Sequence, residues 1–186
     1  MTRKLISVFY EDQLAGAKPN NYGPHALLLA CVADQCQENR WALHLKVIAI
    51  PKKGDSKLRA ALRDDAGLIA QGGRVFALFD LDRVRNCYEL APNACKRTVL
   101  DAIAAEATGA PAIVLLEQHM ETVVEACCAA SNRPLPTTKP SPAERDSILH
   151  GIAAGDRGMR DAVLTSVPSF DRLVRIVNQA IAEMST

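Results

Sequence analysis

The sequence predicts an α/β fold: a three-layer sandwich with a central, mostly parallel sheet of about four strands and a C-terminal helical extension. Two observations predict it. Short apolar runs suited to strands alternate with longer helical segments along the first 131 residues, a pattern typical of parallel sheets with helices on both faces. The run RVFALFDLD at residues 74–82 is apolar almost throughout before its carboxylates, as expected for a strand covered on both faces.

The first elements follow from local composition. Residues 4–11 form a short apolar run and are a predicted strand. Residues 23–36 are rich in helix formers, and Pro24 suits a first helical turn. Residues 41–51 are the second predicted strand, which Pro51 closes.

The middle of the chain continues the alternation. Residues 56–72 form a predicted helix with Ser56 as its N-cap and two glycines after its end. The strand at residues 74–82 is followed by a predicted helix at residues 94–109. Residues 110–118 and 120–131 give the fourth strand and its following helix.

The C-terminal part begins with a break in this pattern. Residues 131–147 contain four prolines and several hydroxyl residues and are a predicted loop. Residues 166–184 carry apolar side chains at helical spacing and predict a terminal amphipathic helix. We therefore expect residues 1–131 to form the α/β domain, and residues 132–186, the loop and C-terminal helices, to pack on the same domain.

Bulk composition sets limits on the function. The 186 residues suit one domain, and 48% apolar residues suffice for a core. The net charge of +1 does not point to nucleic acid or to an acidic partner. We expect a cytoplasmic protein, because the N-terminus does not look like a signal peptide, no apolar run is long enough for a membrane span, and the six cysteines lack a C-x-x-C pair and are expected to be reduced and mostly buried.

Carboxylates follow three of the predicted strands: Glu11 and Asp12 after the first, Asp80 and Asp82 after the third, and Glu117 and Glu121 around the end of the fourth. The carboxyl ends of parallel strands meet at one edge of a sheet, where ligands bind. Strand alternation is expected to put Asp80 and Asp82 on one side. Crowded carboxylates are hard oxygen ligands suited to Mg²⁺ or Mn²⁺, and such a site suits phosphate chemistry.

The order of these acids resembles that of the Toprim domain of topoisomerases, primases and overcoming-lysogenization-defect nucleases. In that order, Glu follows the first strand, Asp-x-Asp follows a later strand, and Glu follows the next. The chain is most similar to small stand-alone Toprim-like proteins, which are often encoded beside ABC-type ATPases. The stretches KKGDSKLRAALRD, FDLDRVRNC and SVPSFDRLVRIV are also similar to that group. Two motifs differ from the family pattern: Glu11-Asp12 replaces Glu-Gly, and His119-Met120-Glu121 replaces Glu-x-Glu.

This resemblance implies a Toprim/Rossmann-like fold and a nuclease that uses Mg²⁺ (or Mn²⁺) to hydrolyse phosphodiester bonds of DNA or RNA. Glu11 would act as general acid/base or as ligand of a second metal. Asp80 and Asp82 would bind the metal, and Glu121 would complete the cluster, with Glu117 as the alternate. The resemblance also implies a role in phage defence or a toxin-like role with an ABC-type ATPase partner.

Basic residues beside these motifs are the expected contacts to the substrate backbone. Lys52, Lys53 and Lys57 lie at a strand end and a helix start, where backbone N–H groups also favour a phosphate. Arg83 directly follows the Asp-x-Asp motif, and His119 is the only histidine near the acids in the sequence.

Two other functions compete with the nuclease. The altered first and last motifs favour a non-catalytic, Toprim-shaped binding or regulatory subunit that docks a partner protein. A phosphohydrolase of the haloacid-dehalogenase type would use Asp80 as nucleophile and Asp82 as acid, but Arg83-Val84 after the motif disfavours it.

Overall fold

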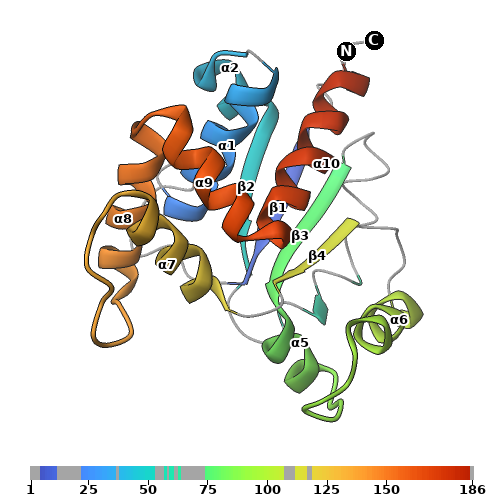
Figure 1. Ribbon diagram of the computed structural model, residues 1–186. Helices are drawn as coiled ribbons and strands as arrows, with labels where there is room; N and C mark the ends of the chain where they lie inside the picture. The colour runs from blue at the N-terminus through green and yellow to red at the C-terminus, as the bar shows by residue number, and fades with distance from the viewer. Residues whose placement is uncertain are drawn as a thin grey trace.

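The computed structural model describes residues 5–11, 22–36, 38–52, 57, 59–60, 63, 74–106, 112–116 and 119–184. Within these residues, four parallel strands form one sheet in the order β2-β1-β3-β4 (Figure 1). The strands are β1 (Ile6–Tyr10), β2 (Val47–Pro51), β3 (Arg74–Asp80) and β4 (Ala112–Leu116). This confirms the predicted α/β class and the parallel sheet.

Side chains alternate between the two faces of the sheet, and each face is covered by its own helices. Val8 and Phe76 lie in a core with α1 (Gly23–Cys36), α7 (Met120–Ala130) and the C-terminal helices. Phe9 and Phe79 lie in the second core, against α5 (Leu81–Cys87) and α6 (Lys96–Glu106). Burial of such side chains contributes about 1.5–3 kcal/mol each, so both faces stabilise the sheet.

The C-terminal helices pack on the first face, beside α1 and α7 (Figure 1). They are α8 (Pro142–Ala154), α9 (Arg157–Ser166) and α10 (Pro168–Met184). The terminal helix is confirmed, but the loop predicted to reach residue 147 ends earlier. Ser141 and Glu144 form a reciprocal capping box, and Pro142 occupies the first turn. These residues start a helix. The sequence prediction overlooked this capping pattern because the segment is rich in proline.

Close contact between α1 and α8 depends on Gly23. A Cβ atom at Gly23 would lie 2.8 Å from the Cα atom of Asp146, which is too close for any side chain. The absence of a side chain therefore lets the first turn of α1 lie directly against α8. This contact sets the distance between Tyr22 and the start of α8.

The strand predicted at residues 41–51 is wrong in its first half. Residues Arg40–Lys46 form helix α2, and β2 begins only at Val47. The side chain of Asn39 accepts a hydrogen bond from the Trp41 N–H at 2.9 Å and caps this helix. Trp41 is 72% exposed rather than buried in the sheet.

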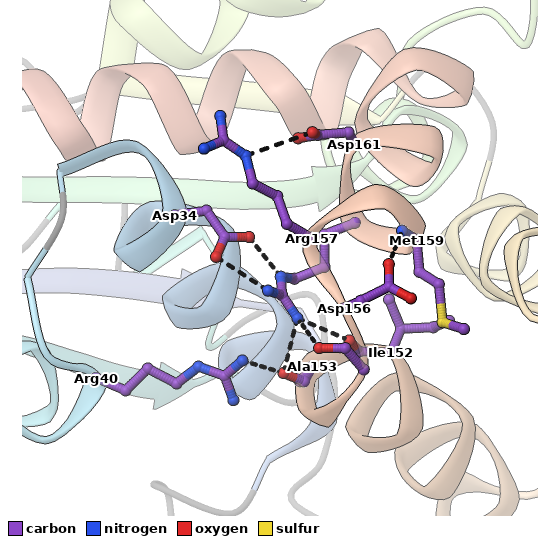
Figure 2. Close-up of polar contacts among 10 residues, drawn as sticks. Asp34, Arg40, Ile152, Ala153, Asp156, Arg157, Met159 and Asp161 are labelled. Atoms are coloured by element: carbon purple, nitrogen blue, oxygen red, sulfur yellow. Dashed lines mark hydrogen bonds and ion pairs between the residues drawn. The ribbon is translucent and has the colours of Figure 1, made fainter.

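A buried ion pair joins α9 to α1. Two guanidinium nitrogens of Arg160 donate to the Asp34 carboxylate at 2.5 and 2.9 Å. The third nitrogen donates to the carbonyl of Gly155 at 2.5 Å, just after the end of α8. Arg40 also donates to the Ala153 carbonyl, as Figure 2 shows. Carbonyls at the C-terminal end of a helix favour positive charge. The cluster therefore links α1, α2, α8 and α9 at one point.

Several other expectations fall partly outside the described residues. The helix predicted at residues 56–72 is helical at residues 57, 59, 60 and 63, and its other residues lie outside the described part. Of the six free cysteines, Cys31, Cys87, Cys127 and Cys128 are buried. Among the described helices, none has the length and apolar character needed to cross a membrane.

Candidate functional site

A pocket of about 340 Å³ lies at the carboxyl ends of β1 and β3, at the lower end of the sheet in Figure 1, where β3 leads into α5. It contains the carboxylates of Glu11, Asp80 and Glu121, and we call it the acidic pocket. Its remaining lining residues are basic, aromatic or apolar and come from the strand ends, the start of α1, helices α5, α7 and α8 and the Pro-rich loop: Tyr10, Tyr22, Leu78, Arg83, Met120, Val124, Lys139, Pro140, Pro142 and Arg145.

Asp80 joins the ends of the two central strands. It is the last residue of β3 and the N-cap residue of α5. Its backbone N–H donates to the Glu11 carboxylate at 3.1 Å. Because β1 and β3 are neighbours in the sheet, this hydrogen bond holds the first and the second predicted acidic motifs together.

The Asp80 carboxylate lies in a site that disfavours its charge. The pKa of Asp80 is raised from 3.8 to about 6, chiefly by burial and also by the nearby Glu121 carboxylate, while a hydrogen bond from the Met120 backbone amide and the charges of His119 and Lys139 oppose the shift. A carboxylate that is partly dehydrated and close to a second acid is stabilised by any cation that joins them. Asp80 is therefore the residue with the most to gain from a metal ion.

Helix α7 brings the third acidic motif to the same place. His119 is its N-cap residue and Glu121 lies in its first turn. One ligand atom each from Asp80, His119 and Glu121 lies within 4.8 Å of the others. The Nδ1 atom of His119 is 3.9 Å from the Asp80 carboxylate. Two carboxylates and an imidazole are a donor set that suits Mn²⁺ and other divalent cations.

Two of the pocket's acids are paired with basic side chains. The ammonium group of Lys139 lies 2.6 Å from a Glu121 carboxylate oxygen. Burial is the largest influence and acts to raise the pKa of Glu121, but hydrogen bonds from Lys139 and from the backbone, with the charges of Lys139 and His119, together hold the pKa below its ordinary value. Arg83 approaches Glu11 at 3.5 Å. Asp80 is the acid that the described cations compensate least.

Asp82 lies at the rim of the site rather than in the acidic pocket. The strand ends at Asp80, so Asp82 falls in the first turn of α5. The expectation that strand alternation carries both aspartates to one side is therefore wrong. Asp82 is 51% exposed and pairs with Arg85 at 2.6 Å. It still reaches His119, whose Nε2 atom lies 3.6 Å from its carboxylate.

The predicted lysines lie elsewhere, as far as they are described. The ammonium group of Lys52 lies over the Phe9 ring, 5.0 Å from its centroid, on the second face of the sheet. Lys57 is exposed, and neither side chain lines the acidic pocket. Arg83 does line it. Lys53 and Glu117 lie outside the described residues, as does Asp12.

The pocket residues that sequence reasoning missed include Tyr22, Lys139 and Arg145. Tyr22 precedes α1, and the other two belong to the Pro-rich loop and to α8. The spacing of residues in the sequence does not indicate where a loop will return to the edge of the sheet. The stretch SVPSF does lie nearby, because Ser166–Ser169 line a second pocket of about 180 Å³ together with His119.

Comparisons of this chain with models of protein families, with curated proteins and with solved structures gave no match. The likeness to Toprim proteins therefore stays a prediction made from short motifs. The geometry of the site alone supports the functional proposal that follows.

Proposed function

We propose that the chain is a metal-dependent phosphodiesterase, a nuclease that acts on DNA or RNA with Mg²⁺ or Mn²⁺. One observation carries the proposal: Glu11, Asp80 and Glu121, predicted from three separate motifs, line one pocket at the carboxyl ends of the parallel strands. Ligands of α/β proteins bind at that edge of the sheet.

The donor set fits a divalent cation on two grounds. Ligand atoms of Asp80, His119 and Glu121 lie within 4.8 Å of one another, so one ion can contact all three. The raised pKa of Asp80 follows first from its burial and then from its proximity to Glu121. A bound cation would offset both effects and supply Lewis acidity to a phosphate oxygen.

The chain's own residues would orient the reaction. The Glu11 carboxylate, held by the Asp80 N–H and by Arg83, faces the same pocket and is placed to accept a proton from water. Arg83 also lines the pocket, is about half exposed, and would hold a substrate phosphate. Pro140 of the Pro-rich loop and Pro142 at the start of α8 also line the pocket.

The test is cleavage of DNA and RNA, single-stranded and double-stranded, with Mg²⁺ or Mn²⁺. We expect Asp80→Asn and Glu11→Gln to lower the cleavage rate by on the order of 100-fold or more. Asp101→Asn is the matched control, because Asp101 is an exposed aspartate on α6, on the other face of the sheet. Equal rates in all variants, or the absence of cleavage under every condition, would refute the nuclease.

A non-catalytic binding subunit is the second proposal. The ion pairs of Lys139 with Glu121 and of Arg83 with Glu11 favour it, because they neutralise two acids without any metal. Under this alternative, Asp80→Asn would leave binding of a partner protein unchanged, as measured by copurification from cells expressing the tagged variant. Loss of a partner on that substitution would count against it.

A further inference from the structure

His119 lies between two aspartates, and each of its ring nitrogens faces one of them. The Nδ1 atom is 3.9 Å from the Asp80 carboxylate, and the Nε2 atom is 3.6 Å from the Asp82 carboxylate. A neutral imidazole has one nitrogen that donates an N–H and one whose lone pair accepts a hydrogen bond or binds a metal ion. The two nitrogens of His119 therefore have different roles, and their neighbours indicate which role each takes.

The Nδ1 side of the ring faces the candidate metal ligands. One ligand atom each from Asp80, His119 and Glu121 lies within 4.8 Å of the others. Two donor atoms that share one ion at about 2.1 Å lie about 3–4 Å apart, depending on the angle between them. The separation of 3.9 Å between Nδ1 and the Asp80 carboxylate lies in this range. The ring is thus placed to offer a nitrogen lone pair to the ion that Asp80 binds.

The Nε2 side of the ring faces a carboxylate that is itself held in place. One oxygen of Asp82 pairs with Arg85 at 2.6 Å, and the other oxygen faces His119. The remaining two guanidinium nitrogens of Arg85 donate to the Ala94 carbonyl at 3.0 and 2.8 Å. All three nitrogens of Arg85 are therefore engaged, and this fixes the direction in which the second oxygen of Asp82 points.

We propose that His119 binds the cation of the acidic pocket through Nδ1, and that Asp82, held by Arg85, orients the ring by accepting the Nε2–H. Imidazole nitrogen suits transition metals, whereas Mg²⁺ prefers oxygen ligands. The ion is then a transition-metal ion such as Mn²⁺ or Co²⁺ in place of Mg²⁺. This inference rests on the proposed metal-dependent function and deepens it by naming the class of ion.

Asp82 is a positioning residue in this arrangement, not a metal ligand. It lies in the first turn of α5, is 51% exposed, and does not line the acidic pocket. Histidines that bind a metal usually donate their second N–H to a carboxylate, which fixes the ring and raises its basicity. The Nε2–Asp82 contact of 3.6 Å is longer than a hydrogen bond, so the half-exposed ring should turn slightly when the ion binds.

Binding of Mg²⁺, Mn²⁺ and Co²⁺, measured by calorimetry on the full chain, tests the choice of ion without any turnover. We expect the affinity to rise in that order, with Co²⁺ bound at least about tenfold more tightly than Mg²⁺. His119→Ala should weaken Co²⁺ binding by about tenfold or more and Mg²⁺ binding by about threefold or less. His119 is half exposed and makes no capping hydrogen bond, so this variant should fold. His150→Ala on α8, away from the lining of the pocket, is the matched control.

His119→Glu gives a result that the loss of a structural residue would not give. The substitution replaces the nitrogen donor with an oxygen donor, so Mg²⁺ should bind more tightly than it does to the native protein. The preference for Co²⁺ over Mg²⁺ should fall by about tenfold or more. A preference that stays the same in both His119→Ala and His119→Glu would overturn the assignment of His119.

Pulsed electron paramagnetic resonance of the protein loaded with Mn²⁺ reports the nitrogen ligand directly. The native protein should show a nitrogen hyperfine coupling, which His119→Ala should lose and His150→Ala should keep. Absence of this coupling in the native protein with Mn²⁺ bound would contradict nitrogen ligation.

Asp82→Ala tests the positioning residue. We expect Co²⁺ binding to weaken by about tenfold and Mg²⁺ binding by about threefold or less, while the nitrogen coupling persists at saturating Mn²⁺. Asp82→Asn keeps an acceptor oxygen and should recover most of the Co²⁺ affinity. Asp101→Ala is the control, because Asp101 also pairs with an arginine, on the exposed side of α6. If Asp82→Ala weakens Mg²⁺ and Co²⁺ binding equally, Asp82 is a direct ligand and its orienting role is wrong.

The outcomes separate this inference from the proposed function. If Mg²⁺ and Co²⁺ bind equally well and Mg²⁺ supports cleavage of nucleic acid, the metal-dependent function stands and the role of His119 is wrong. If Co²⁺ binds through His119 but no nucleic acid is cleaved with any metal, the inference stands and the nuclease fails. If no divalent cation binds, both fail.

Discussion

The Asp34–Arg160 cluster and the acidic pocket both hold buried charge, but the cluster pairs its charges completely, whereas Asp80 in the pocket is compensated only in part. Arg160 is 7% exposed, yet its guanidinium meets a carboxylate and a helix-terminal carbonyl with hydrogen bonds of 2.5–2.9 Å. In the acidic pocket, Asp80 has a raised pKa and Glu121 depends on one lysine from a loop. Buried charge that is fully paired indicates a structural role, and buried charge that remains under-compensated indicates a binding site.

Removal of one partner from the structural cluster should have the largest effect on stability. Asp34→Ala leaves the Arg160 guanidinium buried among carbonyls without its carboxylate. We expect the free energy of unfolding to fall by about 3 kcal/mol or more, measured by chemical denaturation. A loss below about 1 kcal/mol would show that the ion pair is no more than a surface contact.

Gly23→Ala tests the contact that holds the start of α1 against α8, beside the acidic pocket. The added methyl group would meet the backbone of Asp146, 2.8 Å away. We expect a loss of about 1–3 kcal/mol from this overpacking, because Tyr22 and α8 must move apart. Unchanged stability in urea denaturation would mean that α1 and α8 adjust freely.

Asp80→Asn should act in the opposite direction to Asp34→Ala. The folded-state pKa of Asp80 is raised from 3.8 to about 6, so the folded protein binds this proton more tightly than the unfolded chain. The stability that Asp80 contributes is present below about pH 4 and is lost as the pH rises through about 6. The substitution should therefore stabilise the protein by about 1–3 kcal/mol at neutral pH.

The measurement is the free energy of unfolding as a function of pH, for the native protein and for Asp80→Asn. The difference between the two should grow from about pH 4 to above pH 6. Asp101→Asn on α6 is the control and should run parallel to the native protein. A difference that does not vary with pH would show that Asp80 has an ordinary pKa.

Lys139→Gln should have the smallest effect on stability. Lys139 is 82% exposed and lies on a loop, and it pairs with Glu121 in the first turn of α7. Such pairs contribute about 0–1 kcal/mol, so thermal unfolding without metal should be almost unchanged. A larger loss would make Lys139 a structural residue rather than an exposed partner of Glu121.

How well the sequence predicted each part depends on the range of the interactions involved. The parallel sheet and most helices follow from local periodicity and from caps, and three acidic motifs follow from the rule that strand ends meet at one edge. The strand prediction for residues 41–46 was wrong because W-A-L-H-L-K alternates like a strand. The Asn39 cap and the burial of Leu43 alone suit a short helix instead. The predicted placement of Asp82 on the strand was wrong because the strand ends two residues earlier than its apolar pattern suggests.

The missing half of the site was beyond local reasoning for another reason. Lys139 and Arg145 reach the pocket only because α8 folds back against α1, a long-range contact that rests on Gly23 and on the Ser141 cap. Neither signal shows where the helix will lie. A proline-rich stretch is easily treated as a connection, although here it supplies one wall of the pocket.

The most direct test of the central claim is a Mn²⁺ titration of thermal stability at neutral pH, with the native protein, Asp80→Asn, Glu121→Gln and Asp101→Asn. If the acidic pocket holds a divalent cation, the native protein and Asp101→Asn gain about 2.7 kcal/mol at a Mn²⁺ concentration 100 times the dissociation constant, and the two pocket variants gain little. Equal stabilisation of all four proteins, or of none, would contradict the claim.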